Sequence, residues 1–415
     1  MQWLGVLIVA GCGARSFEAG KAAADAGGGD SDVDADTDTG TGTDRPPVFD
    51  AGGPDPDAGV DCDDLPEEGE VLTVGCWTLR QLGADAYTAG TSGLDVDSSD
   101  RAHVLYGAGG IDGSKDAHAL RHATDASGAW LREDITLVGS GLDLAVSPGD
   151  GIHALVSIDS ELFHGLAGPE CWTLDPSPDW GDVSLDVDST EAAHVATHVV
   201  DRAAGGEWLS HSTNEGGEWT AETVDDPGRD PTIRIDDVDV AHILYRTGRS
   251  RALMYATNAT GAWTTEVVAT DLRDSPKLAV HPSGTVHVAY SAGEDLQYAT
   301  NASGSWRIEA ITGAAWADAD GVSIAVDPDG FVHVVHGWRT PPGAYDGPSE
   351  YRVTTNRTGA WVEEFLGDFA SHGTNRSRIA VDSTGTPHVV YTYDLEGYSA
   401  QTAVRYAVRD CPDGE

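Results

Sequence analysis

The chain has 415 residues, of which 24 are Lys or Arg and 69 are Asp or Glu, so its formal net charge is −45. Such a charge repels phosphate backbones and anionic lipid head groups. We therefore expect no nucleic-acid partner and no membrane contact other than a covalent anchor. The length would allow two domains, but it also suits one large repeat domain.

The chain begins with a short apolar segment, residues 1–12, which reads MQWLGVLIVAGC. It is too short to span a bilayer as a helix and is typical of a secretory signal peptide. Its last four residues, Val9-Ala10-Gly11-Cys12, resemble the lipobox of bacterial lipoproteins. The resemblance implies cleavage before Cys12, a diacylglycerol on its thiol, and anchoring to the bacterial outer membrane on its surface or periplasmic side. The alternative is a plain signal peptide.

Residues 13–70 are rich in Gly, Asp, Thr and Pro and contain few large apolar side chains. Such a segment cannot bury enough surface to offset the entropy lost on ordering, so we expect a disordered acidic tether. Aspartates alternate along it, at Asp30, Asp32, Asp34, Asp36 and Asp38. A calcium-binding loop of the EF-hand kind also needs a turn glycine and a terminal acid, which this run lacks.

The remaining residues, 71–411, are built from a repeated unit, and residues 412–415 form a short tail. The unit is clearest in residues 277–311, which contain four short apolar segments. The turns HPSG at 281–284 and NASG at 301–304 each join two of these segments as a β-hairpin. Four antiparallel strands in about 35–50 residues, repeated, are typical of a propeller blade.

A histidine in the second strand marks the unit, which recurs seven times. These residues are His103, His153, His194, His242, His287, His333 and His388. The middle of the first strand lies eight residues before each of them, at Asp95, Ala145, Asp186, Arg234, Ala279, Ala325 and Ala380. A side chain that every blade repeats normally belongs to the packing of the blade. We therefore expect structural, hydrogen-bonded histidines rather than a metal site, with Asp95 and Asp186 as acceptors for His103 and His194.

A tryptophan opens the fourth strand of six units. These residues are Trp130, Trp172, Trp219, Trp263, Trp306 and Trp361. The last unit ends at Arg409 without one, and the matching strand starts at Trp77, at the front of the domain. The pattern predicts an all-β, seven-bladed propeller whose ring is closed by an N-terminal strand in the last blade.

Four cysteines remain besides Cys12, and four cysteines allow three pairings. Aligning the blades places Cys76 and Cys411 on either side of one hairpin turn that is split between the chain ends. We expect a disulfide between them that pins the closure of the ring. Cys62 and Cys171 remain as a second pair.

The turn before each tryptophan carries a resemblance to a known family. Residues 212–219, STNEGGEW, resemble a degenerate Asp-box, the hairpin signature S-x-D-x-G-x-x-W of sialidase-like propellers. Shorter variants begin at Thr124, Thr257, Thr300 and Thr355. The resemblance spans about Glu70 to Arg409, although seven blades replace the six of that family. It would imply glycan cleavage by an arginine cluster, a tyrosine–glutamate pair and an acidic residue. No spacing here assigns such a set, so no catalytic residue is predicted.

The long loops should lie together on one face of the disc, around the mouth of its channel. They join the second strand to the third and one blade to the next, and variable loops on a rigid scaffold commonly bind ligands. The candidate ligand-binding residues there are Arg246, Arg249, Arg251, Trp316, Trp338, Arg339, Tyr345, Tyr393 and Tyr398. Aromatic rings and charged groups together suit carbohydrate.

The sequence thus predicts a monomeric, envelope-anchored binding propeller that needs no cofactor or metal. Its expected ligand is a glycan or an envelope protein. One alternative is a sialidase-like hydrolase or lyase that uses the same face. A second is a structural module of the envelope without a small ligand.

Overall fold

The computed structural model describes the strands of the repeat region and most of the turns between them. The described residues are 8–10, 71–83, 90–108, 119–125, 130–136, 139–168, 171–177, 181–201, 205–247, 251–272, 276–293, 295–312, 321–339, 349–368, 376–394 and 402–411. Residues 11–70 contain no described residue. The predicted lipidation site, the whole of the predicted tether and the C-terminal tail therefore lie outside the described residues.

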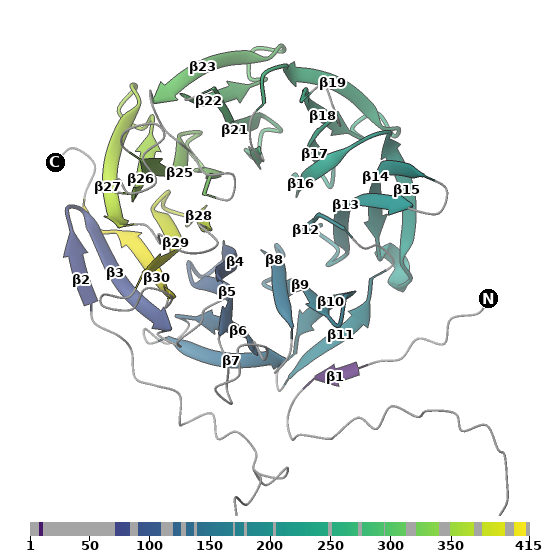
Figure 1. Ribbon diagram of the computed structural model, residues 1–415, viewed down its shortest axis with the longest axis horizontal. Helices are drawn as coiled ribbons and strands as arrows, with labels where there is room; N and C mark the ends of the chain where they lie inside the picture. Colours follow the sequence, from purple (N-terminus) through teal and green to yellow (C-terminus); the bar gives the residue numbers. More distant parts are fainter. Residues whose placement is uncertain are drawn as a thin grey trace, which may run out of the picture. The chain divides into compact units, whose positions relative to one another are not determined.

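Seven antiparallel sheets stand around a central axis, which confirms the predicted seven-bladed propeller (Figure 1). The first strand of each blade lies nearest the axis. In blades one to seven the first strands are β4 (Gly90–Val96), β8 (Ser140–Val146), β12 (Val183–Val187), β16 (Arg229–Ile235), β20 (Lys277–Val280), β24 (Ser323–Val326) and β28 (Ser377–Val381). The second strands are β5 (Ala102–Ala108), β9 (Ile152–Ile158), β13 (Ala193–Asp201), β17 (Ala241–Arg246), β21 (Val286–Ala292), β25 (Val332–Arg339) and β29 (Pro387–Asp394).

The third and fourth strands complete each blade toward the rim. The third strands are β6 (Ala119–Thr124), β10 (Glu161–Ala167), β14 (Gly206–Thr213), β18 (Leu253–Thr257), β22 (Asp295–Thr300), β26 (Ser349–Thr355) and β30 (Thr402–Arg409). The fourth strands are β7 (Leu131–Thr136), β11 (Trp172–Pro176), β15 (Thr220–Asp225), β19 (Thr264–Ala269), β23 (Arg307–Thr312), β27 (Val362–Asp368) and β3 (Trp77–Gly83). Among the described residues no helix is long and apolar enough to cross a membrane.

The two ends of the domain share the last blade, as the sequence predicts. Strand β3 pairs antiparallel with β30, so that Trp77 lies opposite Arg409 and Arg80 opposite Tyr406. A further strand that the sequence analysis did not predict, β2 (Val71–Val74), pairs with β3 and makes this sheet five-stranded. Another, β1 (Ile8–Ala10), pairs with the edge strand β11 of blade two.

The register between first and second strands follows the eight-residue spacing in every blade. His103 lies opposite Asp95 in blade one, and His388 lies opposite Ala380 in blade seven. The same pairing holds in blades two to six. A register slip of one residue would turn every side chain to the other face of its sheet, so this spacing decides which residues reach the core.

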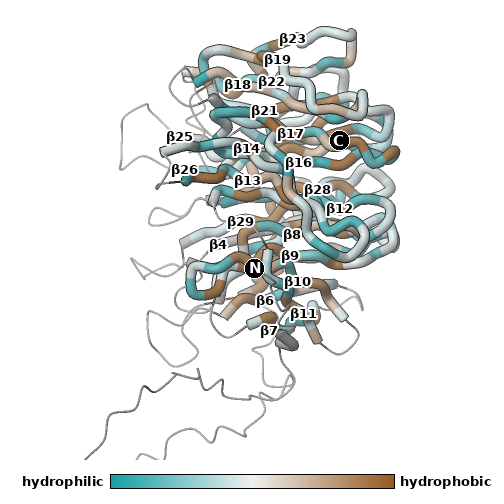
Figure 2. The backbone as a smooth tube through the Cα atoms, turned by 90° about the vertical axis from the view of Figure 1, so that its right-hand side faces the viewer, coloured by the Kyte–Doolittle hydropathy of each residue, from teal (hydrophilic) through white to brown (hydrophobic). Residues whose placement is uncertain are grey.

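The hydrophobic core lies between neighbouring blades rather than inside one sheet. One cluster joins Trp77 and Tyr391 of blade seven to Tyr351 and Leu366 of blade six. Six further clusters occupy the other interfaces. The side view shows hydrophobic segments along the strands (Figure 2). Each blade therefore buries apolar side chains against both of its neighbours.

A tryptophan–glutamate contact links neighbouring blades at the rim. The glutamate lies three residues after the tryptophan of its own blade and accepts a hydrogen bond from the indole Nε1 of the next blade. The pairs are Trp172–Glu133 (2.9 Å), Trp263–Glu222 (2.8 Å), Trp306–Glu266 (2.9 Å), Trp361–Glu309 (2.8 Å) and Trp77–Glu364 (2.9 Å). The repeated tryptophan therefore orients one blade on another.

The turns of the Asp-box-like segments tie the third and fourth strands to the second strand. In blade three the side-chain oxygen of Asn214 accepts a hydrogen bond from the backbone amide of Ala193, at 2.7 Å. Asp125, Asn258, Asn301 and Asn356 accept the equivalent bond in other blades. Within the turns, Gly261, Gly304 and Gly359 adopt φ angles of about 80°, a conformation that favours glycine. These side chains thus act within their own blade.

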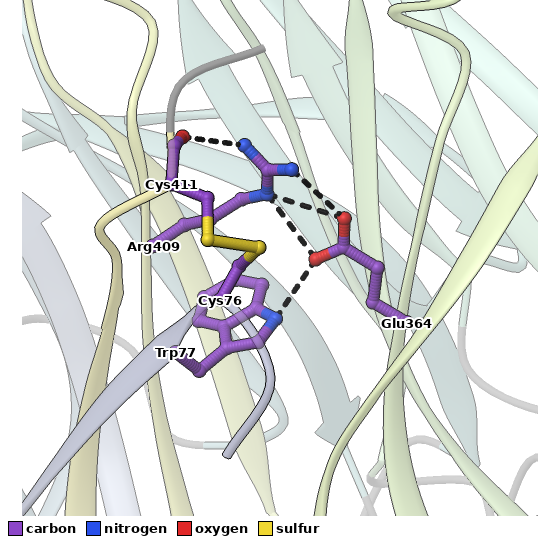
Figure 3. The surroundings of a disulfide bond; sticks show 5 residues. All are labelled: Cys76, Trp77, Glu364, Arg409 and Cys411. Carbon is purple, nitrogen blue, oxygen red and sulfur yellow. Dashed lines mark hydrogen bonds and ion pairs between the residues drawn. A yellow bond between two sulfur atoms is a disulfide. The ribbon is translucent and has the colours of Figure 1, made fainter. Parts of the chain in front are cut away.

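The predicted disulfide between Cys76 and Cys411 is present, with a Cα–Cα distance of 5.0 Å across 335 residues of sequence. Beside it, Arg409 donates to both carboxylate oxygens of Glu364, which also accepts from Trp77 (Figure 3). Cys171 carries no disulfide among the described residues. Its predicted partner, Cys62, lies outside them, so that pairing stays a prediction.

Candidate functional site

The predicted ligand-binding residues fall into three groups. Arg246, Arg251 and Tyr393 are described with their side chains. Trp338 and Arg339 are described only as the last two residues of strand β25. Arg249, Trp316, Tyr345 and Tyr398 lie outside the described residues.

The described members of this set have different surroundings. Arg246 forms an ion pair with Asp230 at the start of β16 in the same blade. Arg251 is exposed in the turn before β18. Tyr393 is only 9% exposed, because its hydroxyl donates to Gln81 at 2.6 Å and its ring lies 3.7 Å from the guanidinium of Arg405. The structure brings Arg246 and Arg251 into blade four and uses Tyr393 in the packing of blade seven.

A small cavity lies in the channel, where the first strands begin. It has a volume of about 50 Å³. Its charged and hydroxyl-bearing lining residues are Asp143, Ser184, Thr232, Arg234, Lys277, Ser323 and Arg378. All except Arg234 occupy one repeat position, two residues before the middle of the first strand. We call this space the upper cavity. Because loops between blades lead directly into these residues, it opens toward the long-loop face.

The aspartates of the channel hold neighbouring blades together. Asp143 of blade two accepts from the amide of Leu185 at 2.9 Å and from the hydroxyl of Ser184 at 3.0 Å, both in blade three. Asp95 accepts from the amide of Val146 at 2.8 Å in the same way. These bonds stabilise the carboxylates and satisfy amides on the inner edge of each blade, where no further strand follows.

Asp186 and Arg234 make a deeper charged pair at the next level of the channel. Asp186 accepts from the amide of Ile235 at 2.6 Å, and Arg234 donates to the carbonyl of Ile233 at 2.7 Å. Burial raises the pKa of Asp186 to about 6, against the opposing effect of the Arg234 charge. Burial likewise raises the pKa of Asp95. Positive charge beside these aspartates keeps them closer to the ionised state.

Hydroxyl groups of the upper cavity are also used between blades. Ser184 accepts from the amide of Ile233, and Ser323 accepts from the amide of Ile379. Thr232 donates to the carbonyl of Pro276 at 3.2 Å. Arg378 donates to the carbonyl of Ser377 at 3.0 Å, as Arg234 does to that of Ile233. With Lys277, it supplies positive charge at the level of Asp143, where an anionic group could enter.

The seven repeat histidines form a buried series of hydrogen bonds. Each is between 1% and 7% exposed. In blades one to three Nδ1 meets the Nε2 of another histidine, in the pairs His103–His122, His153–His164 and His194–His211. In blades four, five and seven it meets a tyrosine hydroxyl, in the pairs His242–Tyr255, His287–Tyr298 and His388–Tyr406. In blade six Val353 stands at this position, and Nδ1 of His333 has no hydrogen-bond partner.

The other ring nitrogen of these histidines points to the turn between first and second strands. Nε2 of His103 lies 3.2 Å from Asp97, and Nε2 of His194 lies 3.1 Å from Asp188. The acceptors are therefore not the predicted Asp95 and Asp186. Those two aspartates lie opposite the histidines in register, but their carboxylates bond to the backbone of the next blade. Asp236, Asp327 and Asp382 take the place of Asp97 in blades four, six and seven.

The residues missed from the sequence are the cations of the upper cavity, Lys277 and Arg378. The sequence contains a signal for them. The repeat position two residues before the middle of the first strand is polar in blades two to seven and is glycine, Gly93, in blade one. A polar side chain on the innermost strand of a propeller faces the channel.

No family model and no curated protein matches the chain. Solved structures do match it. A catalytically inactive virginiamycin B lyase from Staphylococcus aureus shares 11% identity over 80% of this chain and 99% of the lyase, with a TM-score of 0.52. The WD40 repeats of RRP9 share 13% identity over 82% of this chain and all of that structure, with a TM-score of 0.50. The NanB sialidase of Streptococcus pneumoniae shares 12% identity over 82% of this chain and 70% of the sialidase, with a TM-score of 0.41.

The matches to the lyase and to the WD40 repeats agree with the propeller fold. Two of the three proteins are enzymes and the third is a WD40 repeat domain, and identities of this size carry no activity from one protein to another.

Proposed function

We propose that this protein is a binding propeller that holds an anionic glycan at the long-loop mouth of its channel. The observation that carries the proposal is the position of Lys277 and Arg378 on one small cavity of a chain with 69 acidic and only 24 basic residues. A local excess of positive charge in such a chain attracts anions selectively. Arginine and lysine are the side chains that bind carboxylate and sulfate groups most strongly.

The size of the cavity limits what enters it. A volume of about 50 Å³ accommodates a carboxylate group or a few water molecules but not a sugar ring. The acidic group of the ligand would enter the upper cavity, and the sugar would lie above it against the long loops. Arg251 and the predicted aromatic residues of those loops are the side chains that would contact it.

Asp143 makes the site selective as well as attractive. Its carboxylate lies among the lining residues and is held by Ser184 and Leu185. The lining carries three positive charges, and that of Arg234 acts on the buried carboxyls of Asp186 and Asp95. The fixed negative charge of Asp143 beside Lys277 and Arg378 then leaves a single net charge for the ligand to neutralise. A ligand with one carboxylate satisfies the site, whereas a polyphosphate would bring repulsion from Asp143.

Anchoring in the cell envelope forms part of the same proposal. It rests on the resemblance of residues 9–12 to a lipobox and on the composition of residues 13–70. A lipid on Cys12 followed by an acidic tether would hold the propeller away from the membrane while its long-loop face searches for glycans.

A glycan array probed with the full chain tests the proposal. We expect binding to glycans that carry a uronic or sialic acid and weaker binding to their neutral counterparts. Lys277→Gln and Arg378→Gln should each reduce the affinity about tenfold, the loss of one charge-assisted contact. Arg307→Gln, on the exposed outer strand of blade five, removes the same charge elsewhere and should leave binding unchanged.

The two rival functions give different results in parallel assays. Steady release of fluorophore from acidic glycosides by the native protein, with no release by Arg378→Gln, would show that the protein is a hydrolase or lyase and not only a binding protein. Absence of any ligand on the array, together with absence of turnover, would favour a structural envelope module.

A further inference from the structure

The opposite end of the channel holds a larger space than the upper cavity. It has a volume of about 410 Å³ and lies where the first strands end and the short turns begin. This size falls within the range of small-molecule binding sites. It was not predicted from the sequence, which pointed only to the long-loop face.

Aliphatic side chains form one continuous part of the wall of this space. Six of the seven first strands contribute their last residue to it, and each of these residues is β-branched and aliphatic: Val96, Val146, Val187, Ile235, Val326 and Val381. We call them the valine collar. All but Val187 are half-buried, so the collar leaves apolar surface exposed to the channel. Pro148, Pro282 and Pro328 extend the apolar wall outward.

An acidic rim surrounds the collar. Asp97, Asp100, Asp150 and Asp382 line the space directly, and Asp186 reaches it from the first strand of blade three. The seven turns that follow the first strands contain eleven acidic residues and a single arginine, Arg101: the acids are Asp97, Asp100, Asp150, Asp188, Glu191, Asp236, Asp237, Asp239, Asp327, Asp329 and Asp382. The mouth is therefore strongly negative at one end of a channel whose other end carries Lys277 and Arg378.

Hydrogen bonds between blades fix the rim. Asp150 of blade two accepts from the amide and hydroxyl of Ser98 in blade one, at 2.8 and 2.7 Å. Asp100 of blade one accepts in the same way from Ser383 of blade seven, at 2.7 and 2.9 Å. A mouth held in this way is already formed before any ligand arrives, which reduces the entropy lost on binding.

The rim also keeps its charge in weakly acidic solution. Hydrogen bonds from Arg101 and His103 outweigh burial and lower the pKa of Asp97 to about 2. Bonds from Ser98 lower the pKa of Asp150, and bonds from Thr384 and Thr386 help to lower that of Asp382. These carboxylates remain ionised while they accept hydrogen bonds.

From these features we infer that the short-turn mouth binds a small organic cation with an apolar body, such as an alkylammonium or arylammonium compound. The valine collar would bury the apolar part of the ligand, and the ammonium group would lie among the aspartates of the rim. An anionic amphiphile of the same length would meet repulsion at the rim. A strongly hydrated inorganic cation would gain nothing from the collar.

Titration calorimetry with the full chain and a series of n-alkylammonium ions, from propyl to octyl, tests the inference. Each added methylene should tighten binding about fourfold until the collar is filled, since a buried methylene contributes ~0.8 kcal/mol. Octanoate and octanol should bind at least tenfold more weakly than octylammonium. Raising the salt concentration should weaken only the ammonium series.

Two sets of variants separate the collar from the rim. Val381→Thr keeps the shape of the side chain but adds a hydroxyl to the collar, and it should weaken octylammonium binding severalfold. Val238→Thr makes the same change on a residue that is 75% exposed in a turn of the same face, and it should have no effect. The double variant Asp237→Asn with Asp329→Asn removes two exposed charges near the mouth. It should weaken the binding of octylammonium but not the binding of octanol.

Three results would overturn the inference. They are equal binding of octanoate and octylammonium, affinity that does not depend on chain length, and identical behaviour of the Val381 and Val238 variants. If a lysine–leucine–lysine amide bound more tightly than any alkylammonium ion, the ligand would be a basic peptide instead of a small amine. Thermal melting of each variant distinguishes loss of binding from loss of fold.

Discussion

The indole Nε1 of Trp77 donates a hydrogen bond of 2.9 Å to Glu364, which follows it by 287 positions in the sequence. Trp77 lies on β3, the strand that completes blade seven, whereas Glu364 lies on β27 of blade six. Arg409 of β30 donates to the same carboxylate. One glutamate thus joins both ends of the propeller chain to the neighbouring blade.

Glu364→Gln should destabilise the protein more than the equivalent change in another blade. The substitution removes the negative charge of the carboxylate to which both Arg409 and Trp77 donate. We therefore expect a loss of about 1.5–3 kcal/mol in the free energy of unfolding. Glu309→Gln is the matched control, because Glu309 accepts from Trp361 at the same repeat position. It should cost about 1 kcal/mol or less. Urea unfolding of both variants measures the difference, and equal losses would contradict a special role for the closing interface.

The disulfide should stabilise the ring by restricting the unfolded chain. A bond that closes a loop as long as the 335-residue separation of Cys76 and Cys411 is expected to contribute about 2–5 kcal/mol. Replacing both cysteines by serine should lower the free energy of unfolding in urea by that amount. The far-ultraviolet circular dichroism spectrum should stay unchanged. Reduction of the native protein should reproduce the effect. A double variant as stable as the native protein would show that strand pairing alone closes the ring.

Blade six should gain stability from a third-strand tyrosine. His333 is 2% exposed and its Nδ1 has no partner, whereas His287 in blade five bonds to Tyr298. Val353→Tyr would supply the missing hydroxyl at the equivalent position. Val353→Phe adds the same ring without it and reports any cost of tighter packing. We expect the tyrosine variant to be more stable than the phenylalanine variant by about 0.5–1.5 kcal/mol. The reverse order in thermal unfolding would rule out this hydrogen bond.

Stability should fall between pH 6.5 and 4 because several buried histidines are neutral in the folded protein. Burial lowers the pKa of His164 to about 3 and that of His287 to about 4. Since the histidine pKa in an unfolded chain is about 6.5, the unfolded state binds more protons in this window, and falling pH favours it. Each such histidine costs on the order of 1 kcal/mol per pH unit there. Burial raises the pKa of Asp186 to about 6 and also raises that of Asp95, and these two carboxyls act in the opposite direction.

Urea unfolding at pH 7 and pH 5 measures this dependence. His287→Gln should be less stable than the native protein at pH 7, because Tyr298 loses its partner. It should also lose less stability between the two pH values, because one neutral histidine has been removed. An unchanged slope in this variant would show that His287 does not contribute to the acid sensitivity.

The fold could be predicted from the sequence because the repeat shows how the first two strands of each blade pair and which strand closes the ring. The constant distance of eight residues from Asp95 to His103, and from Ala380 to His388, determines which residues lie opposite in the first hairpin. The absence of a tryptophan before Arg409 and its presence at Trp77 identified the closing strand. Strand β2 was missed because a run of four residues, Val71–Val74, carries too little periodicity to be distinguished from a linker.

The site was harder to predict because register does not determine how a side chain is oriented. Asp95 lies opposite His103, but its carboxylate bonds to Val146 of the next blade, and Asp97 bonds to the imidazole instead. Lys277 and Arg378 are far apart in sequence, and only the closed ring brings them to one cavity. The valine collar was missed for the same reason, since each of its residues looks like an ordinary strand end.

Binding of an oligogalacturonate and of its methyl ester to the full chain tests the proposed function most directly. The two compounds have the same sugar skeleton and differ in the charge of the carboxyl group. If Lys277 and Arg378 hold that group, calorimetry should show at least tenfold weaker binding of the ester, and the double variant Lys277→Gln with Arg378→Gln should abolish the difference. An ester that binds as tightly as the acid, or a preference for the acid that is undiminished in the double variant, would contradict the assignment of the upper cavity as the anion site.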